Sequence, residues 1–374
     1  MTVTQRGIAQ FSRVRGLGAM TLLVLLAGCK SNVPERPPEE VVAQAEEKPP
    51  AGSIQLKGAG STFASLLFAR WFKVYHSAHP DIYITYDAVG SGEGVRRFIG
   101  KNVAAQDQVD FGASDSAMSD TQIASVNNDV VMVPATAGCV VLAYNLPEVK
   151  GTLRLSRKAY AGIFLGEITR WNDPLVTQSN PGVKLPDLTI VTVVRQDRSG
   201  TTFALTKNLD AINHRFRERY RPADYVNWSG AMRADGNEGV AGLIEKSTGS
   251  IGYVGYEFAR RIGLDMASLE NRDGMFVKPT EPNCVAALAT ADIPENLRVF
   301  VPDPAGAESY PIVTFSWILL RKSYRNPQTA EALRSLVQWS LQDGQDYAPD
   351  LGYVQLPAIV AEKAMAAVNT VEAK

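Results

Sequence analysis

An arginine, an acid and several hydroxyl side chains are crowded into the segment RQDRSGTTF, which runs from Arg195 to Phe203. The segment follows the apolar run LTIVTVV and precedes residues typical of a helix. Capping a helix requires one serine or threonine, and this turn carries more hydroxyls than that, with a glycine and an arginine beside them. Such a set of hydrogen-bond donors at a strand-to-helix junction is typical of a site for an oxyanion.

Two other turns of the sequence have the same character. In GAGSTF, residues 58–63, a strand ends in glycines and a helix begins at Ser61 and Thr62. In GSGEG, residues 90–94, glycines and Ser91 follow another strand. The first N–H groups of a helix lack partners within the helix and carry partial positive charge. One such turn is usually only a helix cap, but all three follow strands, where open α/β folds bind ligands, so we predict one shared anion site.

Strands and amphipathic helices alternate along the chain from Ile54 onward. We predict helices at residues 64–79, 92–99, 157–168, 201–209 and 326–344. We predict strands at residues 53–60, 81–89, 109–115, 130–135, 139–145 and 188–195. This alternation predicts the α/β class with open, largely parallel sheets.

The composition excludes some classes of partner. The chain has 374 residues, enough for two domains, and is 45% hydrophobic and 21% charged, as in soluble globular proteins. Its formal net charge of −1 argues against nucleic acid, which requires a broad basic surface. A site for a small anion is compatible with this net charge, because one arginine and a few backbone amides hardly change it.

Taken together, the motifs resemble the periplasmic phosphate-binding proteins of phosphate-specific ABC transporters. The resemblance rests on GAGSTF, GSGEG, VDFGASDSAMSD, VVRQDRSGTTF and GSIGYVGYEFA, and with GIFLGEITRWNDP and VKPTEPN it covers almost all of residues 53–360. It implies a type II periplasmic-binding-protein fold, with two α/β lobes, a two-segment hinge and the ligand in the interlobe cleft. Lobe 1 would comprise residues 53–136 and 309–374, and lobe 2 residues 137–308. The segments TAGCVV and ESYPIVTF would cross between lobes that close over the ion.

The resemblance also implies which residues contact phosphate. They are Thr62, Phe63, Ser91, Asp115, Arg195, Asp197, Ser199, Gly200 and Thr201. Backbone N–H groups and hydroxyls would supply most of the contacts. Arg195 would bind phosphate oxygens, and Asp197 would orient its guanidinium.

Asp115 would select phosphate over sulfate. At neutral pH phosphate still carries a proton, and a carboxylate can accept its hydrogen bond, whereas sulfate offers no hydrogen and would be repelled. The alternative for Asp115 is an Asx turn within SDSAMSD.

The N-terminal residues have the pattern of an export signal. Arginines precede the apolar run GLGAMTLLVLLA, which is too short for a membrane span, and LAGC resembles the lipobox of bacterial lipoproteins. We predict a lipoprotein signal peptide at residues 1–28, acylation of Cys29 and a flexible Pro/Glu-rich spacer at residues 29–52. An ordinary signal peptide is the alternative. The protein would be periplasmic or at the cell surface, anchored to the membrane by lipid.

The remaining cysteines and the histidines show no metal-binding pattern. Cys139 and Cys284 are far apart in the sequence, and although export permits a disulfide, we expect two separately buried thiols. His76 and His79 close a predicted helix just before Pro80, and we expect them at exposed polar positions.

The predicted function is binding of inorganic phosphate and its delivery to the permease subunits of an ABC importer, by a monomer without cofactor, metal or nucleic acid. A binder or sensor of another tetrahedral oxyanion, such as sulfate or arsenate, is the alternative. A phosphate ester hydrolase with Ser199 or Ser91 as nucleophile is disfavoured, because no histidine base lies near these motifs and no metal-binding set exists. We therefore expect no enzymatic activity.

Overall fold

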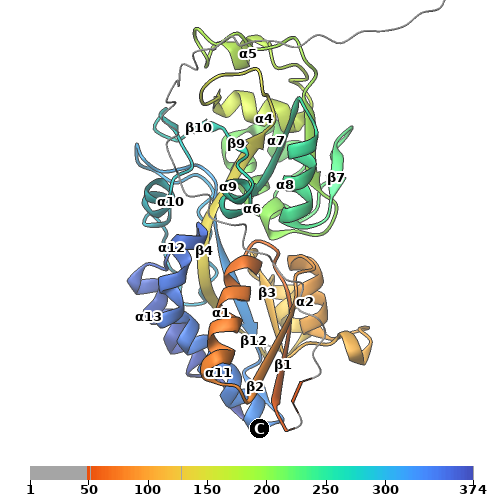
Figure 1. The fold of residues 1–374 in the computed structure, drawn as a ribbon, viewed down its shortest axis with the longest axis vertical. Helices are drawn as coiled ribbons and strands as arrows, with labels where there is room; N and C mark the ends of the chain where they lie inside the picture. The colour runs from red at the N-terminus through yellow and green to blue at the C-terminus, as the bar shows by residue number, and fades with distance from the viewer. Residues whose placement is uncertain (1–48, 51, 128, 374) are drawn as a thin grey trace, which may run out of the picture. The chain divides into compact units, whose positions relative to one another are not determined.

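A nine-stranded sheet forms the centre of the structure, a computed structural model that describes residues 49, 50, 52–127 and 129–373 (Figure 1). In spatial order its strands are β2 (Ile82–Asp87), β1 (Ile54–Gly60), β3 (Phe111–Ser114), β12 (Val313–Leu320), β4 (Val131–Tyr144), β8 (Ser250–Gly255), β6 (Val191–Arg195) and β7 (Met232–Ala234), and β9 (Asp265–Met266) also pairs with β4. The predicted signal peptide, Cys29 and residues 29–48 of the predicted spacer lie outside the described residues.

Strand β4 belongs to both halves of this sheet. It pairs with β12 from Val131 to Cys139 and with β8 from Val140 to Tyr144. Strands β2, β1, β3 and β12 lie on one side of this transition and form lobe 1, whereas β8, β6 and β7 form lobe 2 (Figure 1). The chain leaves lobe 1 within β4 and returns to it just before β12, so the predicted two-lobed α/β fold is confirmed.

Helices complete both lobes. Lobe 1 contains α1 (Ser65–Ala78), α2 (Ser91–Ile99), α3 (Asp120–Ser125), α11 (Pro327–Leu341), α12 (Ala348–Leu351) and α13 (Ala358–Val368), with 3-10 turns at Ala105–Asp107 and Asp343–Tyr347. Lobe 2 contains α4 (Arg157–Leu165), α5 (Pro174–Thr177), α6 (Gly200–Ile212), α7 (His214–Arg219), α8 (Gly236–Lys246), α9 (Tyr256–Arg261) and α10 (Glu281–Leu288). Small sheets join β5 (Arg154–Leu155), β10 (Ser268–Glu270) and β11 (Phe276–Val277), and β13 (Ser323–Tyr324) with β14 (Glu372–Ala373).

Two sequence predictions about the sheet were wrong. The sheet is mixed and not largely parallel, because β4 and β12 run antiparallel to each other and to the strands beside them. The strands predicted at 130–135 and 139–145 form one continuous strand, since residues 136–138 keep pairing with β12. A register shift in β12 lies opposite Pro134, which has no N–H to donate to the ladder.

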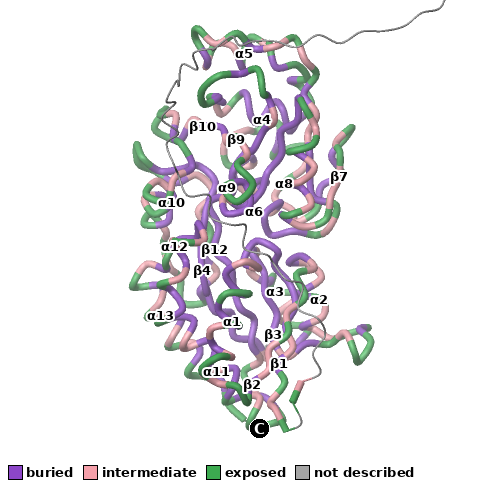
Figure 2. The backbone as a smooth tube through the Cα atoms, viewed as in Figure 1, coloured by how far each residue is buried: buried purple, intermediate pink, exposed green. Residues whose placement is uncertain are grey.

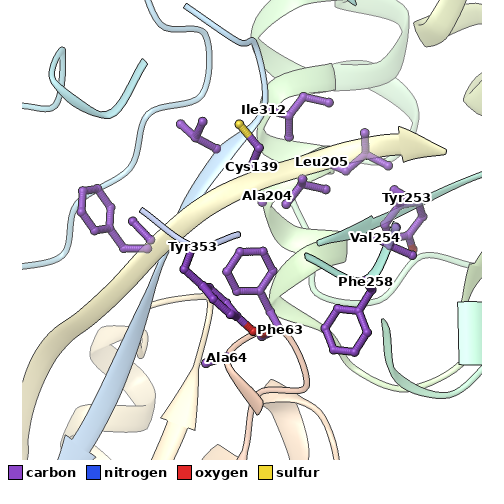
Figure 3. Close-up of a cluster of buried hydrophobic side chains, with 14 of the residues drawn as sticks. Phe63, Ala64, Cys139, Ala204, Leu205, Tyr253, Val254, Phe258, Ile312 and Tyr353 are labelled. Atoms are coloured by element: carbon purple, nitrogen blue, oxygen red, sulfur yellow. Dashed lines mark hydrogen bonds between the residues drawn. The ribbon is translucent and has the colours of Figure 1, made fainter. Parts of the chain in front are cut away.

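The core follows β4, all of whose residues are buried (Figure 2). Helix α1 buries Leu67, Trp71 and Tyr75 on one face, as their spacing predicts. Beside β4, the ring of Phe63 meets the ring of Tyr353 edge-on at 5.8 Å (Figure 3). This apolar contact fixes the turn before α1.

The expectation of two separate thiols was also wrong, because Cys139 and Cys284 form a disulfide. Their Cα atoms lie 5.7 Å apart, although 145 residues separate them along the chain. The bond joins β4 to α10, a proximity that no local pattern reveals. His76 and His79 are partly buried and not exposed. His76 Nδ1 lies 2.7 Å from a backbone carbonyl oxygen, and the His79 ring stacks on Tyr75.

Among the helices of the described residues, none combines the length and the apolar character needed to cross a bilayer.

Candidate anion-binding site

Asp115 follows β3 and is surrounded by serine side chains. Its carboxylate accepts hydrogen bonds from Ser61 and Ser316 at Oδ1, and from Ser91 at Oδ2 over 3.3 Å. The residue is 2% exposed, and its backbone N–H donates to Ser91 Oγ over 3.1 Å. Burial raises the pKa of Asp115, while the serine hydrogen bonds and the charge of Arg195 act in the opposite direction. The carboxylate is therefore a buried acceptor whose Oδ2 is less engaged than Oδ1.

Arg195 ends β6, and Asp197 holds its guanidinium from one side. Arg195 Nε donates to Asp197 Oδ1 over 2.7 Å, and Nη2 forms an ion pair with Oδ2. The backbone N–H of Gly236 also donates to Asp197 Oδ1, over 3.1 Å. The Arg195 side chain is 1% exposed, and its Nη1 donates to Thr201 Oγ1 over 3.3 Å. These contacts fix the plane of the guanidinium.

Ser199 is the N-cap residue of α6. Its Oγ accepts a hydrogen bond from the backbone N–H of Thr202 over 3.2 Å, and its own N–H donates to the carbonyl of Asp224 over 2.7 Å. The cap thus satisfies one of the first N–H groups of the helix. The two N–H groups before it, at Gly200 and Thr201, have no partner among the described residues.

Several buried backbone N–H groups have no acceptor within the described chain. They belong to Thr62, Phe63, Ser91, Gly200 and Thr201. These residues begin or precede α1, α2 and α6, where the helix itself supplies no carbonyl. Nearly all buried N–H groups in folded proteins are paired, so this cluster of donors indicates a ligand with several acceptor oxygens.

The two lobes contact each other directly around these donors. The backbone N–H of Gly92 in lobe 1 donates to the carbonyl of Arg198 in lobe 2 over 3.0 Å. Gly90, with φ of 92°, lies so close to Asp197 that no Cβ would fit between them. Gly200 is in similar contact with Asp115 across the interface. The structure therefore has its lobes closed around the candidate site.

An open cavity of 420 Å³ lies at the margin of this interface. Of the predicted site residues, Thr62 and Asp197 line it, together with Val89, Gly236 and Phe258. The other predicted residues are buried.

Some of the nine predicted site residues thus contact the opposite lobe: Thr62 contacts Asn237, Asp115 contacts Gly200, and Asp197 contacts Gly90. Sequence reasoning missed three buried contributors: Ser61, Ser316 and Asn237. Ser61 lies inside the motif GAGSTF, which could have indicated it. Ser316 is an isolated polar residue in an apolar strand, which is only weak evidence for a binding role. Asn237 begins α8 with no motif around it. Within the described residues, no group of three or more His, Cys, Asp or Glu side chains is placed to hold a metal ion.

Glu257 is a buried carboxylic acid beside the site. It lies in α9 and is 2% exposed, and neither carboxylate oxygen has a hydrogen-bond donor from another described residue. Gly352 of lobe 1 packs against its Cα and Cβ. Burial raises the pKa of Glu257 well above its ordinary value of 4.5, and the charge of Asp115 acts in the same direction.

We expect Gly200→Ala to keep the lobes from closing. A Cβ at this position would lie 2.5 Å from the Cβ of Asp115 and 2.7 Å from its backbone, closer than atoms of a fixed backbone tolerate. Anion affinity measured by calorimetry should fall about tenfold or more, with the far-ultraviolet circular dichroism spectrum unchanged. Gly242→Ala is the control, because space is open around that glycine of α8. Equal affinities of the two variants would contradict the closed contact.

We expect Glu257→Gln to stabilise the protein at neutral pH. Because folding raises this pKa, the folded chain binds more protons than the unfolded chain above pH 4.5, and stability falls as pH rises through that window. The variant should exceed wild type by about 1–3 kcal/mol in urea unfolding at pH 8, and the difference should shrink toward pH 4.5. The exposed neighbour Glu238→Gln should show no such trend. A difference in the free energy of unfolding that does not change with pH would contradict the raised pKa of Glu257.

Comparisons with known proteins show the family of the chain. Residues 43–343 match the family model described as a PBP superfamily domain. The phosphate-binding protein PstS of Haemophilus influenzae is 36% identical over 315 residues, covering 83% of this chain and 92% of that protein. The protein of the same name from Pasteurella multocida is 36% identical over 314 residues, covering 83% of this chain and 89% of its own.

A crystal structure of a phosphate-binding protein from Stenotrophomonas maltophilia has the same fold, with a TM-score of 0.66 at 19% identity. The match covers 84% of this chain and 94% of that chain. The fold and the family model define a two-lobed binding protein of the PBP superfamily. Within that class, the chain belongs to the family of the phosphate-binding proteins named PstS.

Proposed function

We propose that this protein binds inorganic phosphate outside the cytoplasmic membrane and delivers it to the permease subunits of an ABC importer. The observation that carries the proposal is the cluster of buried N–H groups that have no acceptor among the described residues, at helix starts of both lobes and near Arg195 and Asp115. The names of the PstS relatives support phosphate as the anion.

The proposed contacts divide between the lobes. Lobe 1 supplies the N–H groups of Thr62, Phe63 and Ser91. Lobe 2 supplies those of Gly200 and Thr201, the Ser199 hydroxyl and the guanidinium of Arg195, which Asp197 orients. Since neither lobe holds a complete set of donors, binding of the anion favours the closed state over the open one. Closure also excludes water, which strengthens each contact inside.

Asp115 accounts for the choice among anions. Ser61 and Ser316 occupy its Oδ1, whereas Oδ2 has one longer contact, to Ser91. Oδ2 can therefore accept the hydrogen that phosphate retains near neutral pH. Sulfate would place an unprotonated oxygen against this buried carboxylate, which costs binding free energy. Arsenate has the same shape and protonation as phosphate, and we expect it to bind nearly as well.

The remaining assignments complete the proposal. Acylation at Cys29 would anchor the chain to a membrane, and the spacer at 29–52 would let the lobes reach the permease. We retain lobe boundaries of 53–136 and 309–374 for lobe 1 and 137–308 for lobe 2, and a monomeric state. We assign no catalytic role, since no residue of the proposed site is a histidine that could activate a serine.

We expect protein freed of bound anion by unfolding and refolding to bind phosphate with a dissociation constant in the micromolar range or below. Isothermal titration calorimetry measures this directly, with sulfate and arsenate titrated in parallel. Tighter binding of sulfate than of phosphate would favour the alternative oxyanion, and absence of heat with all three anions would refute the proposal.

We expect Asp115→Asn to reduce the ratio of phosphate to sulfate affinity by about tenfold or more, because an amide can donate to sulfate and removes the charge that repels it. Competition between the two anions gives the ratio. Asp110→Asn is the matched control, since Asp110 lies in the same lobe and accepts from the backbone of Lys57 outside the site. An unchanged ratio in the Asp115 variant would remove this residue from its role.

A further inference from the structure

Asn237 connects the two lobes at the candidate site. It is the second residue of α8 and is fully buried. Its backbone N–H and its Nδ2 both donate to Thr62 Oγ1 of lobe 1, over 3.2 and 3.0 Å. Its Nδ2 also donates to Thr201 Oγ1 of lobe 2, over 3.3 Å. One side-chain amide therefore contacts two threonine hydroxyls that belong to opposite walls of the site.

The orientation of this amide is determined by its other end. Asn237 Oδ1 accepts a hydrogen bond from the backbone N–H of Gly255 over 2.9 Å, at the end of β8. Because an N–H group can only donate, the oxygen must face Gly255, and the NH₂ group must face the threonines.

The hydrogen bonds of both threonine hydroxyls follow from this orientation. A hydroxyl has two acceptor lone pairs and one hydrogen. Thr62 Oγ1 accepts from both N–H donors of Asn237, and Thr201 Oγ1 accepts from Asn237 Nδ2 and Arg195 Nη1. In each case two donors occupy the acceptor capacity, and within the described chain neither hydroxyl has an acceptor for its own hydrogen.

We propose that Asn237 is a positioning residue that turns the hydroxyl hydrogens of Thr62 and Thr201 toward the bound anion when the lobes close. The inference rests on the proposed phosphate site and deepens it. In the open protein Thr62 would lose both donors of Asn237, and its hydroxyl could rotate freely. Closure therefore brings Asn237 into contact with Thr62 and joins the lobes. It also leaves the hydroxyls of Thr62 and Thr201 acting as hydrogen-bond donors to the anion, which favours an anion with several unprotonated oxygens.

The decisive variant is Asn237→Asp, which keeps the shape of the side chain and replaces the NH₂ group by an acceptor. Both hydroxyls would then donate to the new carboxylate and present lone pairs to the anion. We expect phosphate affinity, measured by calorimetry, to fall about 100-fold in this variant. In Asn237→Ala the NH₂ group is removed but no acceptor replaces it, and we expect a fall of about tenfold.

Asn180→Asp is the matched control. Asn180 is also a buried amide of lobe 2, whose NH₂ group donates to the carbonyls of Arg154 and Val176, away from the site. Its variant should lose stability without losing phosphate affinity. Equal phosphate affinity of Asn237→Asp and wild type would overturn the inference.

A double-mutant cycle separates positioning from a merely structural role. If Asn237 acts through the Thr62 hydroxyl, Asn237→Ala should cost several-fold less affinity in a Thr62→Val background than in wild type, and its full cost should return in Thr62→Ser. Additive effects in all backgrounds would contradict the mechanism. Failure of wild type to bind phosphate would refute the proposed function itself, whereas phosphate binding with an inert Asn237 would refute this inference alone.

Discussion

The rest of this structure depends on one constraint: several buried backbone N–H groups have no acceptor in the part of the chain that the structure describes. Three helices begin near one another, and the N–H groups of Thr62, Phe63, Ser91, Gly200 and Thr201 at their starts have no acceptor among the described residues. An unpaired buried donor costs about 1–3 kcal/mol, so under the proposed function an anion that supplies the missing oxygens would stabilise the closed arrangement. In the proposed function, ligand binding and lobe closure would therefore be one event.

Charge in the site is balanced locally. Asp197 neutralises Arg195 in the absence of ligand, and the serine hydroxyls around Asp115 compensate part of the cost of its burial. Only the face of the guanidinium not used by Asp197 remains to meet an anion. In the proposed function, this arrangement would recognise a tetrahedral oxyanion through fixed hydrogen-bond directions more than through excess positive charge, consistent with the net charge of −1 of the chain.

Close approach between the lobes depends on residues without side chains. Gly90 and Gly200 face Asp197 and Asp115 across the interface at distances that leave no space for a Cβ. The same close approach brings Asn237 of lobe 2 within hydrogen-bond distance of Thr62 of lobe 1. The glycines permit the contact between the lobes, and the amide of Asn237 adds hydrogen bonds across it. Glu257 differs from these residues: its carboxylate is buried with no hydrogen-bond donor from another described residue, and its raised pKa is expected to make the stability of the fold depend on pH.

The sequence by itself determined the α/β class and, to within one residue, the starts of the helices that begin at Ser65, Ser91 and Gly200, because caps, glycines and apolar periodicity are local signals. The tertiary structure alone decided what lies far apart along the chain. The Cys139–Cys284 disulfide, the continuity of β4 between the lobes, and the approach of Ser316 to Asp115 each require segments that no local pattern connects. The two hydrogen bonds that the Thr62 hydroxyl accepts likewise come from Asn237, 175 residues away, and they leave its hydrogen as the group still free to bind a partner within the described chain.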